Sequence, residues 1–202
     1  MSEYRPGEEE RTRFAHPRVL ARLRDYLATH TPCPLQMSGF RPSAVAVVLL
    51  DIDGLSHVIL TQRSAKLRAH SGQVSFPGGA RDPEDRSAAD TATRECREEI
   101  GVPPDSLEVL GPLDDWATPS GYVITPVLAA SATIPQYQPN RDEVAAVFEA
   151  PLSLFADPTR AISRGFRQVG PLSHPLRTYH HGSYAVTGAT AHILETLCQL
   201  VA

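Results

Sequence analysis

The sequence predicts an α/β fold in which a mixed sheet carries helices on both faces. Residues 44–50 form an almost wholly apolar, valine-rich run, as expected for a central strand that is buried on both sides. Residues 17–29, 87–100 and 188–201 instead repeat apolar side chains at helical spacing. The other predicted strands lie before, between and after these helices, an order typical of one mixed sheet between helical layers.

Length and composition indicate one globular domain. The chain has 202 residues, of which 42% are hydrophobic and 21% are charged, and this is enough for an ample core. We expect residues 1–13 to form a mobile N-terminal arm and residues 14–202 to form the single domain. The formal net charge of −4 gives no global basic field for nucleic acid, so any phosphate binding must be local.

Targeting signals and cysteine usage favour a cytoplasmic protein. No apolar run approaches the ~20 residues that a membrane helix needs, and the N-terminus lacks the apolar core of a signal peptide. The three cysteines show no CxxC spacing, which argues against both a disulfide framework and a zinc site. We therefore expect a reducing compartment and no membrane partner.

After the helix predicted at 17–29, turn-forming residues separate the predicted strands of the first half of the chain. Asp53-Gly54 marks a tight turn that joins the strand at 44–50 to a second strand at 58–61. Residues 64–79 are predicted to be mostly loop, with a short strand within them at 74–76.

The helix predicted at 87–100 has a clear beginning and end. Ser87 followed by Asp90 resembles a capping box, and Gly101 with Pro103 is typical of a helix C-terminus. The apolar stripe of this helix consists of Ala89, Ala92, Cys96 and Ile100. The acidic residues lie on the adjoining arc together with Thr91. The helix can therefore pack on a sheet while it presents acids along its edge.

Shorter patterns predict the remaining elements. Strands are expected at 107–113, 124–130 and 144–148. Residues 173–186 predict a hairpin that turns near His181-Gly182. The last helix, at 188–201, repeats leucine and isoleucine at helical spacing, and no internal repeat or domain boundary is evident.

Three glutamates on the second helix form the main candidate site. Glu95, Glu98 and Glu99 are spaced i, i+3 and i+4, so they share one helical face. Without a cation, three close carboxylates would repel one another and raise each other's proton affinity. Beside the glycine pair Gly78-Gly79 they would suit a hard divalent cation, usually Mg²⁺. The alternative is a solvated acidic helix face.

The segment from Gly79 to Val102 resembles the signature of the Nudix hydrolase family. That signature is Gly, five residues, Glu, seven residues, then Arg-Glu-apolar-x-Glu-Glu-x-Gly-apolar. Its second half is intact here as Arg94-Glu95-Cys96-Arg97-Glu98-Glu99-Ile100-Gly101-Val102. The first half departs from it, because Asp85 stands at the place of the first glutamate and Arg94 comes one residue late. We therefore do not assign to Asp85 the role of the first glutamate of the signature. The alternative that Asp85 lies in a solvated turn stays open.

The residues before this signature resemble the extra motif of the coenzyme A pyrophosphatase branch of the family. The matching residues are Leu60-Thr61-x-Arg63-Ser64, Arg68, Gly72 and Phe76-Pro77-Gly78-Gly79. Together the motif and the signature cover residues 60–102, about a fifth of the chain. Further similarity lies in Asn140-x-x-Glu143-Val144 followed by Pro151-Leu152.

The resemblance implies a Nudix-type α/β/α sandwich with a mixed central sheet and a hydrolase that uses Mg²⁺ or Mn²⁺. Glu95 and Glu99 would be direct metal ligands, with a backbone carbonyl near Gly79 completing the shell. Glu98 would be either a third ligand or the base that activates water. Arg94 would orient a glutamate through a charge-assisted hydrogen bond. Glu143, outside the signature, is an alternative base.

The implied substrate is coenzyme A or a derivative. Its pyrophosphate bond would be cleaved to 3′,5′-ADP and 4′-phosphopantetheine or an acyl-phosphopantetheine. Arg63 and Arg68 match the branch motif and are expected to bind the phosphates. Gly78 and Gly79 would let the backbone approach the metal and the substrate.

Two other interpretations stay open. The first keeps the chemistry and changes the substrate to ADP-ribose, NADH or another nucleoside diphosphate derivative. The second is a non-catalytic module that binds a nucleotide, against which the intact glutamates argue. We expect a small-molecule partner of the coenzyme A type and no nucleic acid, while a homodimer stays open.

Overall fold

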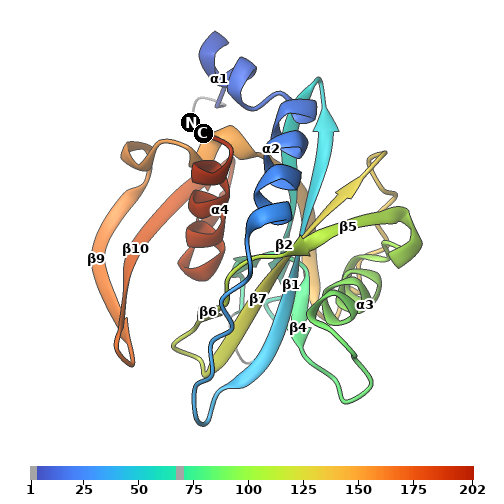
Figure 1. Ribbon diagram of the computed structural model, residues 1–202, viewed down its shortest axis with the longest axis vertical. Helices are drawn as coiled ribbons and strands as arrows, with labels where there is room; N and C mark the ends of the chain where they lie inside the picture. The colour runs from blue at the N-terminus through green and yellow to red at the C-terminus, as the bar shows by residue number, and fades with distance from the viewer. Residues whose placement is uncertain (1–3, 67–70) are drawn as a thin grey trace.

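The computed structural model describes residues 4–66 and 71–202 and contains one large mixed sheet between helices, with a smaller sheet beside it (Figure 1). The helices are α1 (Glu8–Arg13), α2 (His16–Thr29), α3 (Ala88–Ile100) and α4 (Gly188–Leu200). The strands of the large sheet are β1 (Arg41–Ile52), β2 (Leu55–Arg63), β3 (Val74–Ser75), β4 (Gly78–Ala80), β5 (Leu107–Pro112), β6 (Trp116–Ala117), β7 (Tyr122–Ser131) and β8 (Val144–Pro151). The smaller sheet consists of β9 (Ile162–Val169), β10 (Leu172–His181) and β11 (Tyr184–Thr187), and the short 3₁₀ helices are η1 (Pro104–Ser106), η2 (Leu152–Phe155) and η3 (Pro158–Arg160).

The central sheet is mixed because β1 and β7 run parallel. Its strand order is β3-β2-β1-β7-β5, with β4 paired to β1, β6 to β7 and β8 to β2. The β1–β7 pair aligns Val45 with Pro126, and the other pairs are antiparallel. The predicted turn between β1 and β2 is confirmed, since Asp53 and Gly54 both adopt positive φ, 52° and 78°.

The two faces of β1 contact two separate apolar clusters, as the alternation of side chains in a strand requires. One cluster lies on the α3 side and contains Ala44, Ala46, Val48 and Leu50 of β1 with Ala92, Cys96 and Ile100 of α3. The other lies beneath α2 and α4 and contains Val47 and Leu49 of β1, Leu23 of α2 and Leu194 of α4. The α/β/α sandwich predicted from the sequence is therefore confirmed (Figure 1).

Local capping fixes where α3 begins and ends. The hydroxyl of Ser87 accepts a hydrogen bond from the Asp90 amide at 3.1 Å, and the Asp90 carboxylate accepts one from the Ser87 amide at 3.0 Å. Gly101 adopts the left-handed conformation that ends many helices, with φ 73°. The capping box and the glycine stop predicted from the sequence are both confirmed. Because α3 packs on β1 and β4, its glutamates face the Gly78-Gly79 strand.

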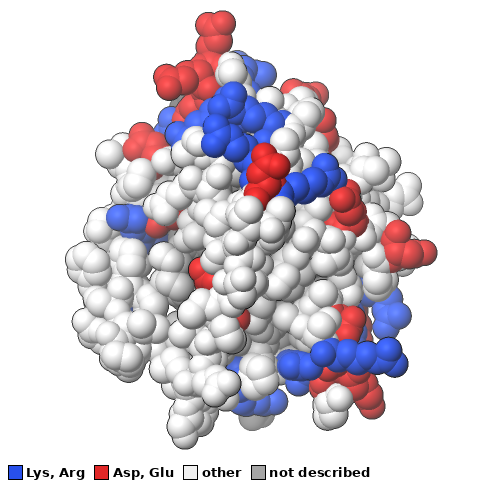
Figure 2. All heavy atoms as spheres, in the orientation of Figure 1, with Lys and Arg blue, Asp and Glu red and all other residues white. Residues whose placement is uncertain are grey.

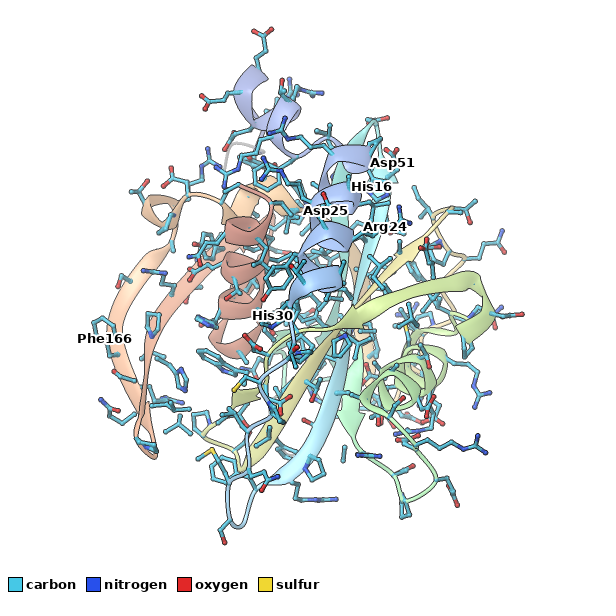
Figure 3. The ribbon with its side chains drawn as sticks, viewed as in Figure 1. His16, Arg24, Asp25, His30, Asp51 and Phe166 are labelled. Atoms are coloured by element: carbon cyan, nitrogen blue, oxygen red, sulfur yellow. The ribbon has the colours of Figure 1, made fainter. Side chains whose placement is uncertain are left out.

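Three features differ from or extend the sequence prediction. Within the segment expected to be a mobile arm, α1 forms a short helix whose Glu10 pairs with Arg160 at 2.8 Å, while its mobility stays a prediction. Residues of β4 were expected in a loop but pair with β1, because the glycine pair gives no β-strand signal by itself. Strand β9 was not predicted, and its Phe166 is 75% exposed (Figure 3).

Charged residues are unevenly spread over the face in Figure 2. They gather at the top, over α1, and at the lower right, near α3, while the centre and the lower left of this face are mostly uncharged (Figure 2). Within residues 4–66 and 71–202, none of the helices combines the length and the hydropathy of a membrane span.

Candidate active site

The site is built where the second half of α3 lies against β4. A Cβ atom at Gly79 would lie 2.5 Å from Cδ of Glu95 and 2.8 Å from its Oε2. A Cβ atom at Gly78 would lie 2.5 Å from the carbonyl oxygen of Ala44 on β1. All three distances are shorter than ordinary Cβ contacts, so a side chain at Gly78 would displace backbone and one at Gly79 would displace the Glu95 carboxylate. At Gly79 the approach brings the backbone to a carboxylate, and at Gly78 it brings two strands together.

Glu99 is the most buried carboxylate of the site, at 4% exposure. Its Oε2 accepts a hydrogen bond from the Gly78 amide at 3.2 Å, and its Oε1 lies 3.8 Å from Nη1 of Arg63. Burial, with a smaller contribution from the charge of Glu95, raises the pKa of Glu99 to about 7. Burial also raises the pKa of Glu95. A bound cation would stabilise the ionised form of both groups.

Glu98 and Glu143 are more accessible. Oε2 of Glu98 accepts a hydrogen bond from Nη1 of Arg94 at 3.0 Å, and the Glu98 side chain is half exposed. Glu143 is exposed and lies in the turn before β8, where its carbonyl oxygen accepts a hydrogen bond from the Ser64 amide at 2.7 Å. After burial, the charge of Glu143 is a further reason why the pKa values of Glu95 and Glu99 are raised. The fold therefore brings all four predicted carboxylates to one region.

These residues fit a divalent cation by their chemistry. Glu95 and Glu99 are oxygen donors held in a buried setting that disfavours two negative charges without a counter-ion. In the described part of the chain, no three acidic, histidine or cysteine side chains already converge as a complete metal shell. The ligand set Glu95, Glu98 and Glu99 accordingly remains a prediction.

Arg94 connects the loop before α3 to the glutamates. Nη1 donates to Oε1 of Glu95 at 2.9 Å and to Glu98, while Nη2 donates to the carbonyl of Ala80 at 3.1 Å. Nε and Nη2 donate to the two carboxylate oxygens of Asp85 at 3.1 and 3.0 Å. All five N–H groups of the guanidinium are thus used, which fixes its orientation.

Asp85 is not in a solvated turn, so that alternative from the sequence was wrong. It is 8% exposed, and hydrogen bonding from Arg94 holds the pKa of its carboxyl well below the usual range. The Arg94–Asp85 contact is bidentate, which is the strongest arrangement for such a pair. The sequence offered one indication of this contact, namely Thr91, a polar residue on the acidic arc of α3 that turns out to be buried.

Of the two arginines predicted to bind substrate, the structure places one. Arg63 ends β2 at the edge of the site beside Glu99, and its Nε is buried without a hydrogen-bond partner among the described residues. Arg68 lies outside the described residues. Among the described residues, Arg63 is the predicted substrate-binding arginine that lies beside the glutamates.

The fold and the site define the class of protein. The NUDIX domain family matches residues 40–166, which is more than half of the chain. The chain therefore belongs to the Nudix family. It is 42% identical over 147 residues to a protein of Pectobacterium atrosepticum named uncharacterized Nudix hydrolase NudL, covering 69% of this chain and 72% of that one. It is 40% identical over 151 residues to the protein of the same name in Escherichia coli K12, with the same shares covered.

A solved structure shows a similar fold. The protein DR0079 of Deinococcus radiodurans superimposes with a TM-score of 0.53 at 15% identity, over 78% of this chain and 82% of that one. At this identity the similarity concerns the fold alone.

Proposed function

We propose that this protein is a metal-dependent pyrophosphohydrolase that cleaves coenzyme A or its derivatives. The products would be 3′,5′-ADP and 4′-phosphopantetheine, or an acyl-phosphopantetheine. One observation carries the substrate assignment. The motif from Arg63 to Gly79, which precedes the Nudix signature, reaches the candidate metal carboxylates at both of its ends. Arg63 lies 3.8 Å from Glu99, and the Gly78 amide donates to the same carboxylate.

This arrangement suits a substrate with several phosphates. Coenzyme A carries a 3′-phosphate as well as the pyrophosphate bridge, so it needs more than one cationic contact. The whole chain has a net charge of −4, so these contacts must be supplied locally. Arg63 and Arg68 lie on the same segment and would provide them.

The roles of the other residues follow from their positions. Glu95 and Glu99 would hold the cation, which when bound neutralises the bridge and acidifies water. Glu98 and Glu143 are the accessible carboxylates and the candidates to accept a proton from the attacking water. Arg94 keeps Glu95 and Glu98 in place. Gly78 and Gly79 leave room for the backbone beside the site.

Product analysis tests the proposal. Purified protein is incubated with coenzyme A and Mg²⁺, and the nucleotides are separated by chromatography. We expect 3′,5′-ADP and 4′-phosphopantetheine in equal amounts, and neither product after Mg²⁺ is chelated. A panel with ADP-ribose and NADH is run in parallel. No turnover of coenzyme A beside rapid hydrolysis of one of these compounds would refute the substrate assignment.

A non-catalytic nucleotide-binding module is the candidate of another class. The partly buried Glu95 and the buried Glu99 argue against it, because a binding module has no need to keep two raised-pKa carboxylates beside an arginine. Equilibrium binding of the same panel without any product formation would favour the binding module instead.

A further inference from the structure

The carboxylate of Asp85 accepts hydrogen bonds from two further donors besides the Arg94 guanidinium. Its Oδ2 accepts hydrogen bonds from the Thr91 hydroxyl at 2.9 Å and from the Asp82 amide at 2.9 Å, in addition to Nη2 of Arg94. Thr91 is fully buried, at 0% exposure. These contacts leave Asp85 one orientation, in which both of its oxygens face Arg94.

The same contacts determine where Arg94 points. Thr91 and Arg94 are three residues apart on α3 and therefore lie on one helical face. With Nε and one N–H of Nη2 held by Asp85, Nη1 is directed at Glu95 and Glu98. The Thr91 hydroxyl donates to Asp85 and to the Ser87 carbonyl. Among the hydrogen bonds of the described residues, its connection to these glutamates therefore runs through Asp85 and Arg94.

The irregular spacing of this chain fits that arrangement. Aspartate is one methylene shorter than the glutamate of the family signature, and the chain has one additional residue before Arg94. The tight turn from Asp82 to Asp85, closed by an amide hydrogen bond of 3.1 Å, brings the shorter side chain to the arginine.

We propose that Thr91 and Asp85 are positioning residues, an anchor that orients Arg94 and through it the carboxylates of Glu95 and Glu98 for the divalent cation. This rests on the proposed function in one respect, namely that these glutamates hold the metal. Thr91 touches neither metal nor substrate in this account. Its contribution is to keep the ligands preorganised before the cation binds.

Thr91→Val tests the anchor, because valine keeps the buried volume and deletes only the hydroxyl. We expect Mn²⁺ affinity, measured by calorimetry without substrate, to fall about tenfold, within the range found for groups that orient metal ligands. Thr91→Ser should restore most of it. The matched control is Thr93→Val, because the hydroxyl of Thr93 bonds only to helix carbonyls, among them that of Ala89 at 2.8 Å. That variant should bind Mn²⁺ like the wild type.

A second variant covers the case in which Thr91→Val fails to fold. Asp85→Asn keeps the shape but places an amide where Arg94 needs an acceptor, and we expect a loss of Mn²⁺ affinity of about tenfold or more. Equal Mn²⁺ affinities in folded wild type, Thr91→Val and Asp85→Asn would overturn the anchor. An equal loss in Thr93→Val would also overturn it, since the effect would then belong to helix stability. A wild type that leaves coenzyme A intact, with Mn²⁺ affinity still lost in Thr91→Val, would refute the substrate and support the anchor.

Discussion

Replacing Gly79 by alanine is the most direct test of how the site is built. Gly79 does not adopt a left-handed φ, so alanine brings no backbone strain there. Its added methyl group would instead lie 2.5 Å from Cδ of Glu95. Carbon atoms pack at about 3.5–4.0 Å, so the carboxylate must move by about 1 Å. That movement also breaks its 2.9 Å hydrogen bond from Arg94.

The expected effect is large on function and small on folding. A displacement of about 1 Å in a positioned group can cost about 100-fold in rate, which corresponds to ~2.7 kcal/mol of barrier. The flexible Glu95 side chain can rotate away, so the fold should survive. Steady-state rates at saturating Mg²⁺ measure catalysis, calorimetry measures Mn²⁺ affinity, and thermal unfolding measures stability.

Gly78→Ala is the matched control for Gly79→Ala. Its methyl group would meet backbone, the Ala44 carbonyl at 2.5 Å and Cα of Val45 at 2.7 Å, and neither can move without shifting β1. We expect this variant to lose stability, by on the order of 1–3 kcal/mol or more. Wild-type rate and Mn²⁺ affinity in Gly79→Ala would refute the placement of Glu95. A thermal shift as large as that of Gly78→Ala would show that the clash is absorbed by the fold.

Three further predictions concern metal, substrate and pH. Glu99→Gln should leave the fold intact and lower kcat by about 1000-fold or more, ~4 kcal/mol, and a near-wild-type rate at saturating Mg²⁺ would contradict its role as a ligand. Arg68→Ala should weaken binding of coenzyme A more than that of dephospho-coenzyme A, whereas equal weakening would exclude a contact with the 3′-phosphate. His192 packs on Trp116 with ring centroids 3.6 Å apart, and burial lowers its pKa to about 4. The unfolded chain takes up the proton first, so stability should fall by about 3 kcal/mol as the pH drops from about 6.5 to 4. Urea unfolding at both pH values should show a smaller fall in His192→Phe.

The sequence predicted much of the fold because the relevant signals are local. The hydrogen bonds that cap α3, made by Ser87, Asp90 and Gly101, join residues within α3 or next to it. The continuous apolar run of β1 likewise identifies a buried strand without knowledge of its partners. Strand β9 escaped prediction because its described side chains other than Val169 are exposed and show no alternation of buried and exposed positions. Its pairing with β10 depends on contacts made elsewhere in the chain.

Part of the site could be predicted from the spacing of residues in the sequence. The rest depends on contacts between segments that only the folded structure brings together. Spacing placed Glu95, Glu98 and Glu99 on one helical face, because helix geometry alone decides it. Spacing left Asp85 without an assigned role, and the structure shows that a tight turn brings its carboxylate to Arg94 despite the additional residue.

The chain by itself determined the helix that carries the glutamates, its register and its family signature, since all of these are set by residues close in sequence. Only the tertiary structure decided that Thr91 and Arg94 both donate to Asp85 and that the Gly78 amide donates to Glu99. It also decided that the Glu95 carboxylate occupies the space where a side chain at Gly79 would lie. Each of these contacts joins α3 to the loop or strand before it. Their existence depends on how closely β4 and the turn at Asp82–Asp85 approach the helix, and packing, not periodicity, sets that approach.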